Sequence, residues 1–167
     1  MRRSTNPPVS NRLTDVEIPR AVWANWIPDD GPRQLRRALT VTERNALEGR
    51  RAELEPMLEP FTPAELDHVV LALSDMFGGF TSMRQGDEDA AARLDSVVRL
   101  LAPFPAWAIA KACSYIQMNG VYRDGKFDRR WPPNDPEIVK EVRSAMQLYA
   151  QQHSQAVAML SATVEEK

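Results

Sequence analysis

Residues 101–139 read LAPFPAWAIAKACSYIQMNGVYRDGKFDRRWPPNDPEIV, and this stretch decides the fold. Pro105 suits the first position of a helix, where its missing N–H costs nothing, and Gly120 suits a left-handed cap at the helix end. Apolar side chains between them cover most of the helix circumference, and a helix that is apolar nearly all round lies inside a domain. We therefore predict a central core helix from Pro105 to Met118.

A rigid turn and a long helix follow this core helix. The turn at 131–136 reads WPPNDP. Each proline disfavours helix in the residue before it, so the chain should be extended over 130–134, and Asp135 should cap a helix that begins at Pro136. Apolar or neutral residues then recur three and four apart to about Ala162, which is the spacing of a coiled-coil seam. The seam consists of Val139, Val142, Met146, Tyr149, His153, Ala156 and Leu160.

The remaining helices are predicted from caps and apolar stripes. Capping boxes at 40–43 and 62–65 begin two helices. The first is a surface helix to about Glu55, and the second is a core helix whose apolar stripe ends at Gly78. A further apolar face runs over 90–101. Because no run alternates apolar and polar residues as a half-buried strand does, the predicted fold class is all-α, a small helical bundle with a long C-terminal helix and a flexible N-terminal arm.

Composition divides the chain into four parts. Residues 1–20 are predicted to form a flexible arm, because proline, serine, threonine and asparagine bury too little surface to offset their ordering entropy. Residues 21–60 hold a docking segment and the surface helix. Trp23 and Trp26 of this segment would dock on the same chain or anchor in a partner, and we favour docking on the same chain. The other two parts are a helical bundle over 61–149 and a projecting helix end with its tail over 150–167.

The overall charge excludes several classes of partner. The chain has 167 residues, a net charge of −2 and a pI of about 5.7, so it has no overall electrostatic footprint for duplex DNA, RNA or an anionic membrane. The single cysteine, Cys113, lies on the apolar helix and suits a small buried hydrophobe in a reducing compartment. No signal peptide and no apolar run of about eighteen residues is present, so we expect a cytoplasmic protein without a membrane span.

Residue types that catalysis requires are not arranged for it. His68 and His153 lie far apart and have no partners at metal-ligand spacing. The Gly78-Gly79 pair lacks the lysine of a phosphate-binding loop. Glu65 and Asp67, two positions apart on a helix, point to different faces and cannot share a substrate. We therefore expect neither an enzyme nor a metal or cofactor site.

Two segments are candidate binding sites. The loop 121–131 interleaves aromatic and basic residues, which would stack on the bases of a single strand and contact its phosphates. In the alternative, its aromatic residues, Trp131 or Tyr122 and Phe127, are pinned on the bundle. The C-terminal helix outruns the bundle, and because an isolated overhang is marginal in water, a partner protein would cover its seam. The nucleic-acid candidates are Arg123, Lys126, Arg129 and Arg130, and the partner-binding candidates are Val142, Met146, Tyr149, His153 and Leu160.

Three segments carry a resemblance to a known family. They are Leu66–Phe80, Leu94–Cys113, and Arg130-Trp131-Pro132-Pro133 with Pro136-Glu137-Ile138. Together they resemble the compact helical domain of phage replicative-helicase loader and inhibitor proteins. The resemblance implies that the aromatic-Pro-Pro turn closes this domain, and that the segment after it binds the hexameric helicase and helps to place it on single-stranded origin DNA. The chain departs from the family pattern in its N-terminal region and in its long C-terminal helix.

Two functional hypotheses follow from these observations. The first is a phage or prophage replication accessory protein that binds a replicative helicase, as loader or inhibitor, through protein–protein contacts. The alternative is a DNA-binding or counter-defence regulatory protein that uses the basic aromatic loop 121–131. Binding that weakens steeply with salt would indicate phosphate contacts and favour the second hypothesis. The oligomeric state stays open.

Overall fold

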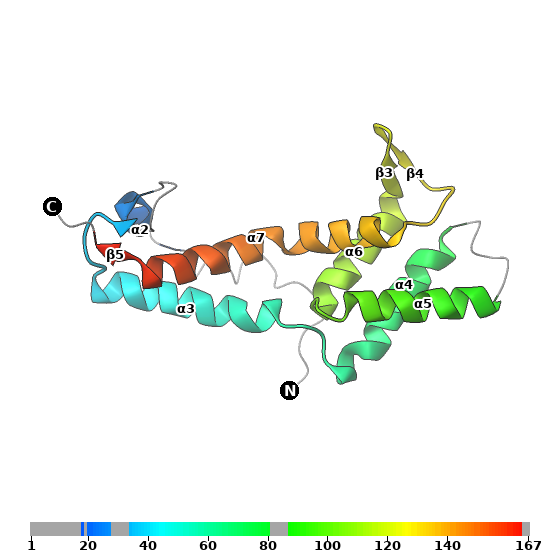
Figure 1. The fold of residues 1–167 in the computed structure, drawn as a ribbon, viewed down its shortest axis with the longest axis horizontal. Helices are drawn as coiled ribbons and strands as arrows, with labels where there is room; N and C mark the ends of the chain where they lie inside the picture. The colour runs from blue at the N-terminus through cyan, green and yellow to red at the C-terminus, as the bar shows by residue number, and fades with distance from the viewer. Residues whose placement is uncertain (1–17, 19, 28–33, 81–86, 165–167) are drawn as a thin grey trace. The chain divides into compact units, whose positions relative to one another are not determined.

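The computed structural model describes residue 18 and residues 20–27, 34–80 and 87–164. Helices dominate these residues, which confirms the all-α class and the long C-terminal helix (Figure 1). The flexible arm predicted for residues 1–20 lies almost wholly outside the described residues. The helices are α2 (Arg20–Asn25), α3 (Val41–Leu58), the short 3-10 helix η1 (Pro63–Glu65), α4 (Leu66–Gly78), α5 (Asp87–Leu101), α6 (Ala106–Asn119) and α7 (Asp135–Ser161).

The described residues form two compact units. We call the part from Glu59 to Gln147 the bundle unit, and its bounds nearly coincide with the bundle predicted over 61–149. The terminal unit combines the described residues before Glu59 with those after Gln147. Helix α7 therefore contributes its first half to the bundle unit and its second half to the terminal unit.

Helix α6 is the core helix of the bundle unit and packs chiefly against α4. Pro105 is extended and acts as its N-cap, and Gly120 ends it with a φ of 84°. Leu73 and Met76 of α4 are fully buried. These observations confirm the predicted core helix. Its buried residues are Ala106, Trp107, Ala108, Ile109, Ala112, Cys113 and Ile116.

The segment after α6, predicted as a loop, forms a β-hairpin. Strand β3 (Val121–Arg123) pairs antiparallel with β4 (Lys126–Asp128). The two turn residues, Asp124 and Gly125, have φ angles of 50° and 79°, as a tight two-residue turn between twisted strands requires. The Asp-Gly pair is a strong sequence signal for such a turn. The strands were missed because each has 3 residues, which is too short to show an alternating pattern.

The N-cap of α7 is Asn134, not the predicted Asp135. The Glu137 N–H donates to Asn134 Oδ1 at 2.9 Å, and the Asn134 N–H donates to Glu137 Oε2 at 2.8 Å, so the two residues form a reciprocal capping box. Asp135 instead lies beside Arg93 of α5, with 3.5 Å between Oδ1 and Nη2. The same Nη2 donates to the carbonyl oxygen of Pro133 at 2.8 Å. Arg93 thus fastens the Pro-Pro turn to α5.

The terminal unit joins segments that are far apart in the sequence. Strand β2 (Gln34–Leu35) pairs antiparallel with β1 (Trp26–Ile27) and parallel with β5 (Thr163–Val164). Trp26 packs on the core of this unit, as predicted for docking on the same chain, whereas Trp23 is exposed. The core consists of Val22, Leu47, Ala156 and Met159, with Ile18, Trp26, Leu39 and Leu160 packed against it.

The second half of α7 does not end as the sequence predicted. Its seam was expected to fray or to meet another chain beyond Tyr149. Instead the helix continues to Ser161, and its Ala156 and Met159 are buried in a cluster with residues of α2 and α3. The N-terminal segment of the same chain therefore covers this part of the seam.

Candidate functional site

Three aromatic side chains gather at the hairpin of the bundle unit and stay exposed. The ring of Phe127 lies 5.2 Å from that of Tyr122 and 6.4 Å from that of Tyr115, measured between centroids, and both pairs are edge-to-face. The exposed fractions are 42% for Tyr115, 55% for Tyr122 and 48% for Phe127. We call these three residues the aromatic cluster. Contiguous exposed apolar surface marks interaction sites on proteins, and aromatic residues are enriched in them.

The aromatic cluster corrects one prediction and adds one residue. The prediction that Tyr122, Phe127 or Trp131 is pinned on the bundle needs correction, because all three stay about half exposed, Trp131 to 59%, although the Phe127 ring contacts Tyr115 of α6. Tyr115 was not predicted as a site residue, since it lies on the core helix. In the sequence, Tyr115 lies four residues after Lys111, and this spacing predicts that the two side chains share one face of the helix.

The register of the hairpin separates the aromatic residues from the basic ones. Successive residues of a strand point to opposite faces of the sheet. Tyr122 lies opposite Phe127 on one face, and Arg123 lies opposite Lys126 on the other. Aromatic and basic residues that alternate in the sequence are therefore segregated in the structure.

Arg123 ties the hairpin to the beginning of α7. Its Nε donates to Glu137 Oε1 at 2.7 Å and its Nη2 donates to Glu137 Oε2 at 2.6 Å, which is a two-pronged ion pair. The same Nη2 donates to the carbonyl oxygen of Pro132 at 2.9 Å. The hydrogen bonds from Arg123 lower the pKa of the Glu137 carboxyl, and they raise the pKa of Arg123. This guanidinium is committed within the chain.

The two following arginines are also bonded within the chain. Arg129 Nη2 donates to the carbonyl oxygens of Gln117 at 2.8 Å and Met118 at 2.5 Å, where a cation offsets the negative end of the α6 dipole. Arg130 pairs with Asp128 at 3.2 Å, and its hydrogen bonds lower the pKa of that carboxyl. Of the predicted nucleic-acid contacts, Lys126 alone makes neither an ion pair nor a side-chain hydrogen bond among the described residues.

Gly120 fixes where the hairpin leaves α6. Its N–H donates to the carbonyl oxygen of Ile116 at 2.7 Å, and its φ of 84° is one that side chains other than glycine rarely adopt. A Cβ at this position would overlap the carbonyl oxygen of Asp128 and contact the Arg129 side chain. The close approach of β4 to Gly120 holds the aromatic cluster in one place.

The predicted partner-binding residues of α7 do not form an open surface. Val142 is fully buried and Tyr149 is 9% exposed, so neither of these predicted side chains is open to a partner in this structure. Met146 and His153 are half-buried. Leu160 packs against the core of the terminal unit.

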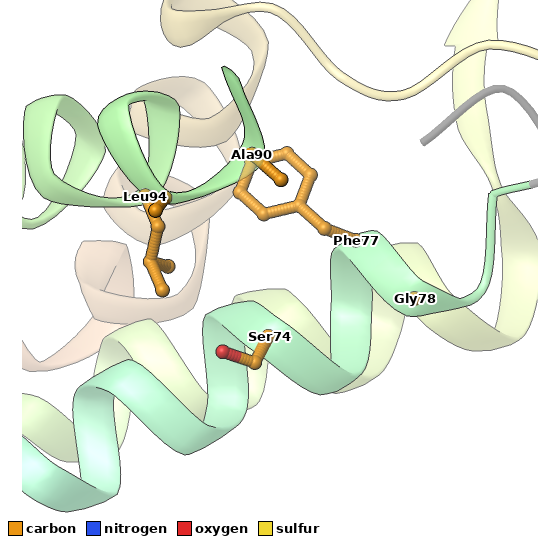
Figure 2. Close-up of a pocket in the computed structure, with 6 residues that line it drawn as sticks. Ser74, Phe77, Gly78, Ala90 and Leu94 are labelled. Atoms are coloured by element: carbon orange, nitrogen blue, oxygen red, sulfur yellow. The ribbon is translucent and has the colours of Figure 1, made fainter. Parts of the chain in front are cut away.

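An apolar pocket of about 250 Å³ lies between α4 and α5 (Figure 2). Arg93 stacks over its Phe77 at 5.4 Å from the ring centroid. Ser74 supplies the one hydroxyl of the lining, and no lining residue is a base that would activate it. The pocket is smaller than usual small-molecule sites, which exceed about 300 Å³. Its lining residues are Ser74, Phe77, Gly78, Ala90, Ala91 and Leu94.

The described residues form neither a reactive thiol nor a cluster that could hold a metal ion. Cys113 is buried, and burial raises the pKa of its thiol to about 12, so the thiolate needed for chemistry does not form near neutral pH. Within the described ranges, His, Cys, Asp and Glu do not gather in threes to hold a metal ion. None of the described helices is both long and apolar enough to cross a membrane.

No protein-family model matches the sequence, and no curated protein or solved structure matches the chain at a significant level. The functional interpretation therefore depends on the aromatic cluster and on the residues that hold it.

Proposed function

We propose that the chain is an adaptor without catalytic activity of its own, and that it binds a protein partner through the aromatic cluster. The observation that carries this proposal is that Tyr115 of α6 and Tyr122 and Phe127 of the hairpin are exposed although the hairpin is tied to α7. Tyrosine and phenylalanine bury a large area at a small cost in side-chain entropy, so they act as anchors of interfaces. A rigid hairpin lowers the ordering cost of binding further.

We propose that the partner is a hexameric replicative helicase, which makes the chain a phage or prophage replication accessory protein, a loader or an inhibitor. What supports this partner is the sequence resemblance at Leu94–Cys113 and Arg130-Trp131-Pro132-Pro133. The hairpin lies between these two segments. The contact surface proposed for this chain thus precedes the Trp-Pro-Pro turn, whereas the family resemblance implies the segment after it.

A DNA-binding or counter-defence function is the second candidate. Exposed aromatic rings and the unpaired Lys126 favour it, because a single strand binds by stacking and phosphate contacts. Two observations weigh against it. The cations Arg123 and Lys126 lie on the face opposite Tyr122 and Phe127, and the arginines are bonded within the chain.

Binding to purified bacterial replicative helicases tests the proposal. A panel of hexamers is immobilised, and the affinity of the full chain is compared with that of a Tyr122→Ala/Phe127→Ala variant by biolayer interferometry. One anchor residue of an interface is worth about 2 kcal/mol or more, which is about thirtyfold in affinity, so the loss of both should weaken binding by about a thousandfold if the two losses add.

The control is Leu71→Ala on α4, which removes an equally exposed apolar side chain from the same unit. It should change the affinity less than about threefold. Undiminished binding by the aromatic variant would contradict the proposed site. Binding of a thymidine oligonucleotide, with no binding of any helicase, would favour the second candidate.

A further inference from the structure

Exposed side chains continue from the aromatic cluster along α6. Lys111, Ser114, Tyr115 and Met118 lie within one arc of the helix and are all exposed. The α6 sequence, AWAIAKACSYIQMN, contains no acidic residue, and Lys111 is its one charged residue. Among the α6 residues on the face that carries Tyr115, Lys111 is therefore the one charged side chain, and it lies at the end away from the hairpin.

Lys111 has no counter-ion in the part of the chain that the structure describes. It lies one helical turn, about 6 Å along the axis, from Tyr115. Tyr115 in turn contacts Phe127 and, through it, Tyr122. A segment that covers the three rings and continues along α6 would bring its next side chain to the Lys111 ammonium.

The basic residues of the hairpin do not contribute to this face. Arg123 and Lys126 lie opposite each other on the other face of the hairpin, and Arg123 is bound to Glu137. The ring plane of Phe127 is inclined by 68° to that of Tyr122 and by 67° to that of Tyr115. The three rings therefore form a ridged surface rather than parallel platforms for successive bases. Both observations favour a protein segment over a nucleic-acid strand.

We propose that the aromatic cluster and Lys111 bind a segment of a protein partner that carries apolar anchor side chains followed by a carboxylate. This inference rests on the proposed function and specifies the chemistry of the partner. The apolar side chains cover Tyr122, Phe127 and Tyr115, and the carboxylate pairs with Lys111. The charge at the rim adds selectivity and little affinity, because an exposed ion pair is worth at most a small factor in binding.

Three fluorescein-labelled peptides test the inference by fluorescence anisotropy with the full chain. All share one pattern of leucine and tryptophan at helical spacing, and their flanking positions are Glu, Lys or Gln. The Glu peptide should bind about three- to tenfold more tightly than the Lys peptide, with the Gln peptide between them. Lys111→Glu should reverse this order, because it inverts the one charge that α6 itself carries.

The matched control is Lys126→Glu, which makes the same charge change on the opposite face of the hairpin. It should leave the Glu peptide preferred. Circular dichroism checks that each variant keeps the helical content of the parent, so that a lost preference is not a lost fold. The reversal by Lys111→Glu is a gain of binding for the Lys peptide, which an unfolded variant would not give.

The contrary outcomes are distinct from one another. Equal binding of the three peptides, abolished by Tyr122→Ala/Phe127→Ala, would overturn the charge preference and leave the proposed function standing. Peptide binding that survives the aromatic substitutions would overturn both. Absence of binding by every peptide would overturn the inference, and so would tighter binding of a thymidine oligonucleotide that is lost in Lys126→Glu.

Discussion

The aromatic cluster on the hairpin and the seam of α7 were both candidate partner surfaces, and their environments differ. On the seam, Val142 is fully buried, Tyr149 nearly so, and Ala156 lies in the core of the terminal unit. On the hairpin, Tyr122 and Phe127 are about half exposed. Apolar periodicity indicates that one face of a helix is buried, and on α7 the residues that bury it belong to the same chain. The aromatic side chains of the hairpin have no such cover in the part of the chain that the structure describes.

Truncation of a buried side chain of α7 should lower the stability more than any other change considered below. Met159 is 1% exposed in the core of the terminal unit, so Met159→Ala should lower the free energy of unfolding by about 2–5 kcal/mol. Leu148→Ala, on the same helix at a side chain 59% exposed, should cost less than about 0.5 kcal/mol. Urea unfolding followed by circular dichroism measures both. Equal costs would mean that the seam is not covered as described.

A substitution at Gly120 should destabilise the hairpin that carries Tyr122 and Phe127. Gly120→Ala puts a side chain on a residue with φ of 84° and ψ of −169°, a region essentially restricted to glycine, at a cost of about 1–3 kcal/mol. Overlap with the Asp128 carbonyl oxygen adds to this cost. Gly125→Ala has a comparable φ of 79° but open space around its Cβ, so it should be the milder change. Unfolding curves give the order, and NMR contacts between the Tyr122 and Phe127 rings should weaken in the Gly120 variant alone.

A smaller effect is expected on how the thermal stability depends on pH in the parent and in Glu43→Gln. Hydrogen bonds from Arg37, at 2.8 and 2.7 Å, and from Thr40 lower the pKa of Glu43 in the terminal unit from 4.5 to about 2. Because the folded pKa is lowered, the stabilisation is complete above about pH 4.5 and is lost as the pH falls towards about 2. Thermal melts of Glu43→Gln should therefore depend less on pH across this window.

Glu48→Gln on the exposed side of α3 is the control for this titration. Its melting temperature should follow the parent at every pH between about 2 and 4.5. If Glu43→Gln and the parent lose stability in parallel on acidification, then the Arg37–Glu43 pair does not contribute the expected stabilisation. Glu137, whose pKa is also lowered, should give the bundle unit an acid sensitivity of the same sign.

Local signals predicted the helices of the bundle, and pairings distant in sequence were missed. Pro105 and Gly120 mark the ends of the core helix because proline and glycine restrict or permit particular backbone angles at their own positions. The pairing of β2 with β5 joins Gln34 to Thr163, and no local pattern encodes such a contact. The cover of the α7 seam by residues of α2 and α3 is also a contact between distant parts of the sequence, and it was missed for the same reason.

The candidate site was predicted only in part, for a similar reason. The sequence pattern singled out the aromatic and basic residues of the segment 121–131. Their separation onto two faces depends on the hairpin register, which the Asp124-Gly125 turn sets. The hydrogen-bond partners of Arg123 and Arg129 lie on other elements, so no local sequence pattern indicates that these cations are committed within the chain.

The central claim is that a partner binds the hairpin and not the seam of α7. Hydrogen–deuterium exchange of the full chain, with and without a bound replicative helicase, tests it directly. We predict slower amide exchange in the helicase complex over Tyr115–Asp128, and unchanged exchange over Leu148–Ser161. Slower exchange over Leu148–Ser161, with none over Tyr115–Asp128, would contradict the account and place the partner on α7.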